Sequence, residues 1–174
     1  ILYKLKSCFL LVVNAANILK NMDWIQSRVQ SDDVSVKNLS DSISLIALQG
    51  PESRKILSNF DVFKKYVKNL NFYSFADFSS DSKLRLISRT GYTGELGYEI
   101  YGDHNFIKML WRSLVNEYKI EPIGLAARDI LRLEMGYRLY GNDINENINP
   151  IESNLSWILD KKNDFIGKEN MSQF

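Results

Sequence analysis

The sequence predicts an α+β fold in which mainly antiparallel strands pack against helices. Short segments rich in β-branched, aromatic and aliphatic residues occur between segments of helical periodicity. Short connections of the kind found in β-hairpins join neighbouring strand segments, which favours antiparallel pairing. Of the 174 residues, 45% are hydrophobic and 25% are charged, which is the composition of a globular protein with a sizeable core.

The chain is expected to begin with a β-hairpin and a helix. Residues 1–5 and 9–13 have strand composition, with Lys6 and Ser7 between them. The helix is predicted from apolar residues at helical spacing, and Asn17 is its expected N-cap. These apolar residues are Ile18, Met22, Ile25 and Val29.

Strands and short helices are expected to alternate in the next part of the chain. Residues 34–36 suggest a short strand and residues 44–48 a buried one. Pro51 suits the first turn of a short helix, and residues 61–67 are expected to form another. Residues 71–82 mix aromatic residues with Ser and Asp, so they are expected to be irregular with at most one strand.

A glycine-rich turn is expected between two further strands. Residues 84–88 alternate as in a half-buried strand, and residues 98–101 form the second strand. The three glycines of the intervening segment 91–97 have the spacing neither of a dinucleotide-binding loop nor of a P-loop. The segment is therefore a strand connection or a small-molecule site, since glycines let a ligand approach the backbone closely.

The last part of the chain is expected to hold two helices and one strand. Asp103 is the predicted N-cap of the first helix, and residues 124–134 form the second. Turns are expected over residues 136–150 and a short strand over residues 156–159. The side chains expected on one side of the first helix are Ile107, Leu110, Leu114 and Tyr118.

Composition excludes several classes of function. A single cysteine, Cys8, and a single histidine, His104, allow neither an internal disulfide nor a Cys/His zinc site, and no metal site is expected. The 22 basic and 21 acidic residues leave a net charge of +1, which argues against nucleic-acid binding. No apolar run approaches 18 residues, so no membrane span is expected.

Charged side chains alone do not identify a site. Glu95 and Glu99 could be paired carboxylates of a glycosidase, but nothing in the sequence fixes their separation. The predicted helix 124–134 carries a cluster of charges for which pairing on the helix surface is the simplest explanation. These charged residues are Arg128, Asp129, Arg132 and Glu134.

Six stretches of the chain together resemble a known family, the T-protein aminomethyltransferases of the glycine cleavage system. The likeness extends over nearly the whole chain, which has about half of the family's usual length. The stretches are 11–17 (LVVNAAN), 88–100 (SRTGYTGELGYEI), 124–134 (GLAARDILRLE), 139–143 (LYGND), 155–157 (LSW) and 164–168 (DFIGK).

The resemblance implies a fold and an activity. Family members move a one-carbon unit from the aminomethyl-lipoyl arm of the H-protein to tetrahydrofolate and release ammonia, in bacterial cytoplasm or the mitochondrial matrix. Three domains form a ring around a folate channel. Residues 1–35 would end the first folate-binding domain, 36–150 would form the second α+β domain, and 151–174 would return toward the first. The C-terminal barrel domain would be absent.

The resemblance also implies folate-binding residues. Glu99 and Arg128 match the family's folate-binding glutamate and arginine, and Asn14 and Tyr137 match polar positions that line the channel. A pterin edge offers two N–H donors beside a carbonyl acceptor, so a carboxylate can accept both donors and a guanidinium can serve the carbonyl or a glutamyl carboxylate. The alternative is that Glu99 and Arg128 pair with each other in a buried salt bridge.

The family's catalytic aspartate has no counterpart in this chain. It lies in an Asp-x-Ile/Val-x-Tyr pattern whose last three positions match residues 1–3, which places it two residues before Ile1. Residues 1–174 alone are therefore expected to be inactive or nearly so.

Alternatives to the aminomethyltransferase are the folate domain of a dimethylglycine or sarcosine dehydrogenase, and a folate-binding module without catalysis. A related iron–sulfur assembly factor is disfavoured, because its characteristic cysteine is missing from residues 89–95.

Overall fold

The computed structural model describes residues 1–31, 33–81, 83–160 and 162–171. Its strands are β1 (Leu2–Lys4), β2 (Phe9–Leu11), β3 (Ile43–Gln49), β4 (Phe75–Asp77), β5 (Leu86–Ser88) and β6 (Gly97–Asp103). Its α-helices are α1 (Ile18–Gln26), α2 (Ser53–Leu57), α3 (Asp61–Val67), α4 (His104–Arg112) and α5 (Leu125–Glu134). Shorter helical segments are η1 (Ala15–Asn17), the π-helix η2 (Ser113–Glu117), η3 (Ser156–Ile158) and η4 (Lys168–Met171).

Some predictions reach beyond the described residues. Residue 82 closes the predicted irregular segment, residue 32 belongs to the predicted end of the first domain, and residues 161 and 172–174 belong to the predicted return segment. These positions lie outside the described residues.

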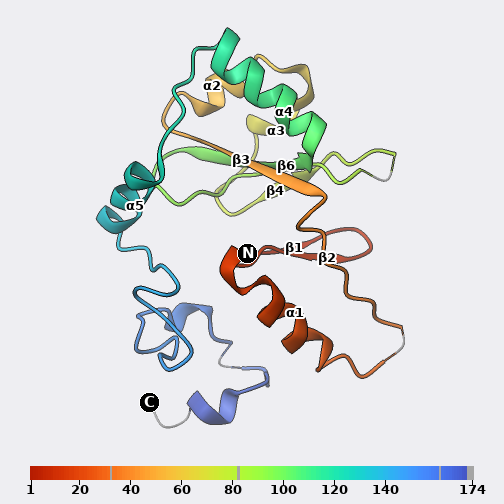
Figure 1. Ribbon diagram of the computed structural model, residues 1–174, viewed down its shortest axis with the longest axis vertical. Coiled ribbons are helices and arrows are strands. Elements are labelled where there is room, and N and C mark those ends of the chain that lie inside the picture. Colours follow the sequence, from red (N-terminus) through yellow and green to blue (C-terminus); the bar gives the residue numbers. More distant parts are fainter. Residues whose placement is uncertain (32, 82, 161, 172–174) are drawn as a thin grey trace.

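The described strands form antiparallel sheets, which confirms the predicted α+β class. One sheet has the strand order β3-β6-β5-β4, and β1 pairs with β2 in a separate hairpin. In the larger sheet β6 lies between β3 and β5, so Glu99 pairs with Ala47 on one side and with Ser88 on the other. Figure 1 shows α2, α3 and α4 grouped beside this sheet and the hairpin between the sheet and α1.

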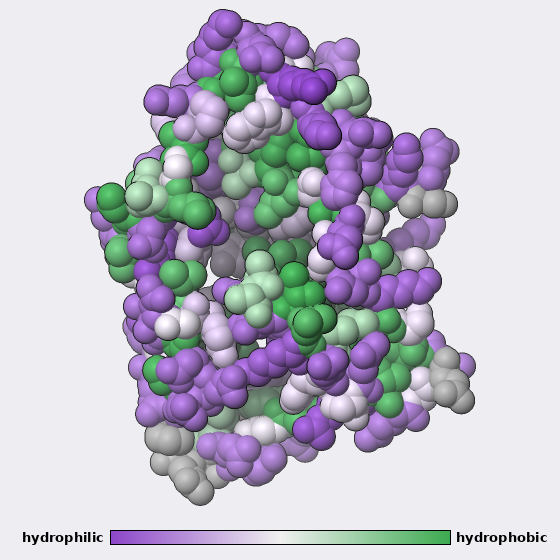
Figure 2. All heavy atoms as spheres, in the orientation of Figure 1, coloured by the Kyte–Doolittle hydropathy of each residue, from purple (hydrophilic) through white to green (hydrophobic). Residues whose placement is uncertain are grey.

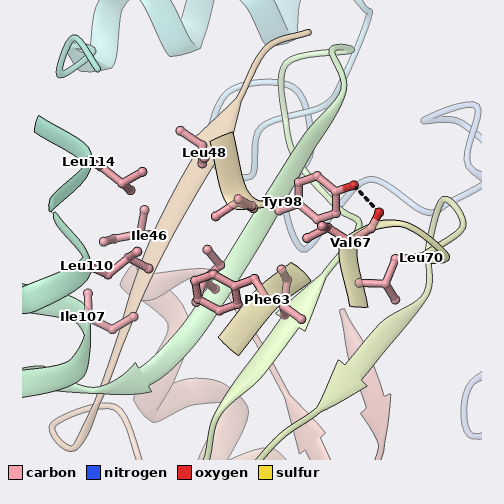
Figure 3. Close-up of a cluster of buried hydrophobic side chains, with 12 residues drawn as sticks. Ile46, Leu48, Phe63, Val67, Leu70, Tyr98, Ile107, Leu110 and Leu114 are labelled. Atoms are coloured by element: carbon pink, nitrogen blue, oxygen red, sulfur yellow. Dashed lines mark hydrogen bonds between the residues drawn. The ribbon is translucent and has the colours of Figure 1, made fainter. Parts of the chain in front are cut away.

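One face of the sheet carries the main hydrophobic core. Apolar side chains of β3, β5 and β6 pack there against α2, α3, α4 and η2. Tyr98 lies at the centre of this cluster, fully buried, and its hydroxyl donates to the backbone carbonyl of Val67 at 3.1 Å (Figure 3). The labelled core residues of Figure 3 are Ile46, Leu48, Phe63, Val67, Leu70, Tyr98, Ile107, Leu110 and Leu114.

The opposite face of the sheet receives the hairpin. Because side chains alternate along a strand, Glu99 and Tyr101 point away from the face that Tyr98 occupies. Tyr3 of the hairpin packs there, its ring edge-on to Tyr101 with 5.7 Å between centroids. A smaller apolar cluster of Tyr3, Leu86 and Tyr101 thus joins the hairpin to the sheet next to Glu99.

Many predicted elements are confirmed where local signals are strong. The hairpin, the strand over 44–48 and the helix over 61–67 are present, and the turn 91–97 links two neighbouring strands. Asp103 caps α4 as predicted, with its Oδ1 accepting from the Phe106 N–H at 3.1 Å.

The N-cap of the first helix differs from the prediction. Asn14, not Asn17, makes the side-chain cap, and its Oδ1 accepts from the Ala16 N–H at 3.0 Å at the start of η1. Asn17 makes no side-chain cap bond where α1 begins. The strand over 84–88 is also shorter than predicted, and β5 is buried on both faces because Ile87 packs into the main core and Leu86 packs against Tyr3 of the hairpin.

Two predicted strands are wrong. Around residues 34–36, the Ser31 hydroxyl accepts from the Asp33 N–H, and the Val34 N–H bonds to the Ser31 carbonyl, so local turn bonds replace strand pairing. At the other segment, Ser156–Ile158 form the 3₁₀ turn η3 instead, with Trp157 73% exposed. No strand of the described part of the chain pairs with either segment, and a strand forms only against a partner.

Within the described residues no helix has both the length and the apolar character to cross a membrane.

Candidate functional site

The Glu99 carboxylate is held on the sheet face opposite the main core. Its side chain is half-buried, and the Thr90 hydroxyl donates to its Oε2. The Thr90 Oγ1 in turn lies 2.9 Å from the Ser88 Oγ on the neighbouring strand β5. The Glu99 carboxylate therefore lies beside the hydroxyl groups of Thr90 and Ser88 on this face of the sheet.

The Tyr101 phenol lies near the same carboxylate. Burial raises the pKa of Tyr101 far above its usual range, and the Glu99 charge and the neighbouring Tyr3 hydroxyl raise it further. The two tyrosine hydroxyl groups are 3.3 Å apart. Tyr101 thus stays protonated at neutral pH and presents a hydrogen-bond donor near the carboxylate.

Arg128 belongs to an aromatic stack. Its guanidinium lies 4.7 Å from the centre of the Tyr92 ring, and Tyr92 stacks on Tyr137 with 5.6 Å between centroids and 21° between planes. The Tyr92 hydroxyl donates to the Arg138 carbonyl. Burial raises the pKa of Tyr92, while the charges of Arg132 and Arg128 act in the opposite direction. The stack holds Arg128 at the exposed surface of α5. The planar guanidinium N–H donors are accessible to a ligand there.

Arg132 is the structural centre of this region, and the predicted surface pairing of the α5 charges is wrong for it. Its side chain is 3% exposed and donates to Asp129 at 2.7 Å, to Asp143 and to the Tyr137 carbonyl at 3.0 Å. The Leu139 N–H and Arg132 lower the pKa of Asp143. Sequence spacing indicated the Asp129 contact, but no pattern indicated Asp143. The buried guanidinium therefore fixes the segment that places Tyr137.

The glycine-rich turn connects the two groups. Thr90 at its start contacts Glu99, while Tyr92 two residues later carries Arg128. Gln49 at the end of β3 anchors the turn, donating to the Thr90 carbonyl at 3.2 Å. A Cβ on Gly97 would overlap Gln49, and a Cβ on Gly94, whose φ is +77°, would overlap Met135 beyond α5. Gly97 thus leaves room for the Gln49 side chain within the sheet, and Gly94 lets the turn approach the end of α5 closely.

The structure brings the four predicted residues together only in part. Arg128 and Tyr137 share the Tyr92 stack, but no ion pair joins Glu99 and Arg128 among the described side chains, so the salt-bridge alternative is wrong. Asn14 is exposed at the start of η1. Figure 2 shows the surface recessed between the segment that holds α5 and the part of the chain near the N-terminus.

Two further surface hollows are present, and the first of them is lined in part by Ala47, the strand partner of Glu99. One, of about 490 Å³, lies between β3 and α4 and is lined by Leu45, His104 and Trp111. The other, of about 320 Å³, lies at the end of α1 beside Trp24. No group of three or more His, Cys, Asp or Glu side chains could hold a metal ion in the portion of the chain that the structure describes.

The arrangement suits recognition of a polar heterocycle. A carboxylate held by hydroxyl donors keeps free lone pairs for N–H groups of a ligand, and an exposed guanidinium on an aromatic ring suits a carbonyl or a carboxylate. Thr90 and Tyr92 were not singled out from the sequence, although both lie in the stretch 88–100, and Arg132 was named only as one of the charged residues of helix 124–134. Nothing in periodicity marks them, because their partners are set by tertiary packing.

Comparison with known proteins places the chain in a family. The aminomethyltransferase of Pseudothermotoga lettingae is 45% identical over 165 residues, covering 93% of this chain and 45% of that protein. The Thermotoga maritima aminomethyltransferase is 44% identical over 163 residues, covering 92% of this chain and 44% of that protein. The chain thus spans less than half the length of these relatives.

A solved structure gives the same result. The crystal structure of glycine cleavage system aminomethyltransferase T from Bartonella henselae superposes with a TM-score of 0.78 at 34% identity, covering 92% of this chain and 42% of that one. The antiparallel sheets and packed helices are thus those of the T-protein fold, as predicted. The sequence also matches the family model of the GCVT N-terminal domain over residues 1–163. The chain therefore belongs to the GCVT N-terminal domain family, that of the aminomethyltransferases of the glycine cleavage system.

Proposed function

We propose that this chain forms the tetrahydrofolate-binding part of an aminomethyltransferase of the glycine cleavage system. In that reaction a one-carbon unit passes from the aminomethyl-lipoyl arm of the H-protein to tetrahydrofolate, and ammonia leaves. The observation that carries the proposal is the Glu99 carboxylate, held by Thr90 on the sheet face opposite the main core, within a family whose relatives are aminomethyltransferases.

Each predicted residue has a physical role in this proposal. Glu99 accepts the two N–H donors of the pterin edge, which makes a charge-assisted bidentate contact. Arg128 donates to the pterin carbonyl or to a glutamyl carboxylate, and Tyr137 supports it through the Tyr92 ring. Asn14 contributes its amide N–H group, because its Oδ1 already accepts from Ala16. The family's catalytic aspartate, expected two residues before Ile1, supplies the proton chemistry.

The division of the chain follows the same proposal. Residues 1–35 close the first folate-binding domain, residues 36–150 form the second domain, and residues 151–174 return toward the first. The relatives described above are bacterial, which favours the bacterial cytoplasm over the mitochondrial matrix.

Two measurements on the full-length protein test the proposal. Calorimetric titration with tetrahydrofolate should show binding, and incubation with aminomethylated H-protein and tetrahydrofolate should release ammonia. Binding without ammonia release would identify a folate-binding module instead. Absence of binding would refute the proposal as a whole.

A further inference from the structure

Glu99 lies at the end of a short chain of hydroxyl groups from Ser88 and Thr90. Thr90 Oγ1 contacts both Ser88 Oγ, at 2.9 Å, and Glu99 Oε2. A hydroxyl group has one proton to donate, and an ionised carboxylate only accepts. Thr90 therefore donates to Glu99, and Ser88 donates to Thr90. The direction of both hydrogen bonds is fixed by this chemistry.

Burial allows this chain of hydrogen bonds little freedom. Ser88 is 0% exposed and Thr90 is 4% exposed, so water has little access to replace either hydroxyl group. Thr90 is also fixed through its backbone, because its carbonyl accepts from the Gln49 side chain. Donors in series strengthen one another in a medium of low dielectric constant.

A second hydroxyl group lies near the carboxylate. The Tyr101 phenol lies beside Glu99 and is itself 3.3 Å from the Tyr3 hydroxyl. The carboxylate thus has two hydroxyl neighbours, one at the start of the turn and one on its own strand. A side chain as flexible as glutamate gains a single orientation from two such neighbours, and this removes an entropic cost of binding.

We propose that Thr90 is a positioning residue, whose hydroxyl, backed by Ser88, holds the Glu99 carboxylate in the orientation that accepts the pterin N–H donors. This inference rests on the proposed function, because it assigns what orients the folate-binding carboxylate. One lone pair of Oε2 is taken by Thr90, and lone pairs on both oxygens remain for the ligand.

Variants at Thr90 in the full-length protein test this role by tetrahydrofolate titration. Thr90→Val removes the donor with almost the same shape and should weaken binding about tenfold, while Thr90→Ser should restore it to within about twofold. Ser58→Ala is the control, because the Ser58 hydroxyl donates to the Arg54 carbonyl at 2.8 Å at the end of α2 and to neither Glu99 nor Gln49. It should leave the affinity within about twofold of the parent.

A double-mutant cycle separates positioning from general damage to the fold. If Thr90 acts through the carboxylate, Thr90→Val should cause no further loss in a Glu99→Ala background. It should also cause a smaller loss for a tetrahydrofolate analogue in which methyl replaces the pterin 2-amino group, since that analogue keeps only one of the two donors. Equal losses for both ligands, or a full loss in the Glu99→Ala background, would overturn the positioning role.

The outcomes also separate this inference from the proposed function. If Glu99→Ala leaves tetrahydrofolate affinity unchanged, the folate site itself is wrong, and the positioning role fails with it. If Glu99→Ala weakens binding and Thr90→Val does not, only the positioning role is wrong. Should Thr90→Val fail to fold, Ser88→Ala serves in its place, with an expected loss of about threefold, and parental affinity would count against the proposal.

Discussion

The sheet body and the segments on either side of it differ in how much apolar surface they bury. Every member of the main core cluster lies between Ile46 and Leu114, and several are fully buried. The segments before β3 and after residue 120 instead leave many large apolar side chains exposed. Examples are Phe9, Leu19, Trp24, Leu125, Ile130, Leu133, Trp157 and Ile166.

The candidate site spans both kinds of region, and this difference decides how firmly each residue is held. Glu99 lies in the sheet body, on a strand paired on both sides. Arg128, Tyr137 and Asn14 lie in the flanking segments, where polar contacts such as those of Arg132 replace a packed core. The carboxylate is therefore placed by hydrophobic packing of the sheet, whereas the guanidinium is placed by a small network of charges and rings.

The largest expected effect is on the stability of the sheet body. Phe63 is 0% exposed and packs edge-on against Phe78 and Phe106, so Phe63→Ala should cost about 3–5 kcal/mol of unfolding free energy. Trp157→Ala, at a ring 73% exposed, should cost less than about 1 kcal/mol. Urea unfolding followed by circular dichroism measures both variants. Similar losses at the two positions would show that the flanking segments are as tightly packed as the body.

Tetrahydrofolate affinity should also fall further for a change in the sheet body than for a change in a flanking segment. Glu99→Ala removes a half-buried, hydrogen-bonded charge and should weaken binding by about 10–100-fold, corresponding to about 1.5–3 kcal/mol. Arg128→Ala should fall near the lower end of this range, because Arg128 is exposed. Calorimetric titration of the full-length variants decides this, with Glu95→Ala as the control for a nearby exposed carboxylate. A greater loss at Arg128 than at Glu99 would reverse the proposed ranking.

The contact between the two regions can be tested through alkaline pH. Burial and the Glu99 charge raise the pKa of Tyr101 far above its ordinary value near 10, so the folded protein keeps a proton that the unfolded chain loses. This contribution to stability is complete below about pH 10 and should decline above it, by about 1.4 kcal/mol per pH unit. Tyr101→Phe should flatten the decline in urea midpoints between pH 9 and 11. Tyr73→Phe, at an exposed phenol, is the control, and an unchanged slope in Tyr101→Phe would contradict the assignment.

The sequence predicted the parts of the fold that local signals determine, and it failed where tertiary partners decide. Residues 61–67 form a helix as predicted, and Asp103 caps the next one, because both signals act within one turn. The strand expected at 34–36 is absent because β pairing needs a partner, which a single segment cannot reveal.

The same limit applies to the site. The resemblance supplied Glu99 and Arg128, but nothing in the sequence indicated that Tyr92 lies between Arg128 and Tyr137, or that its hydroxyl reaches a carbonyl 46 residues away. Arg132 shows the limit most clearly. Its spacing from Asp129 is typical of a surface pair, yet the loop that carries Asp143 folds over it and buries it. Contacts of this kind are decided by packing, not by spacing.

The smallest expected effect concerns the starts of the two helices that follow β6. In the sheet body, Asp103 caps α4 with its side chain, whereas Gly124 begins α5 without a side-chain cap. The φ of Gly124 is −75°, and a Cβ there would meet no atom within 4 Å, so an L-residue fits without strain. Gly124→Ser should therefore add about 0.5 kcal/mol to the free energy of unfolding, because serine caps slightly better than glycine and has less backbone freedom to lose on folding. Thermal unfolding should show a rise of about 1–2 °C in Tm. A fall in Tm would mean that the start of α5 is packed against another part of the full-length protein.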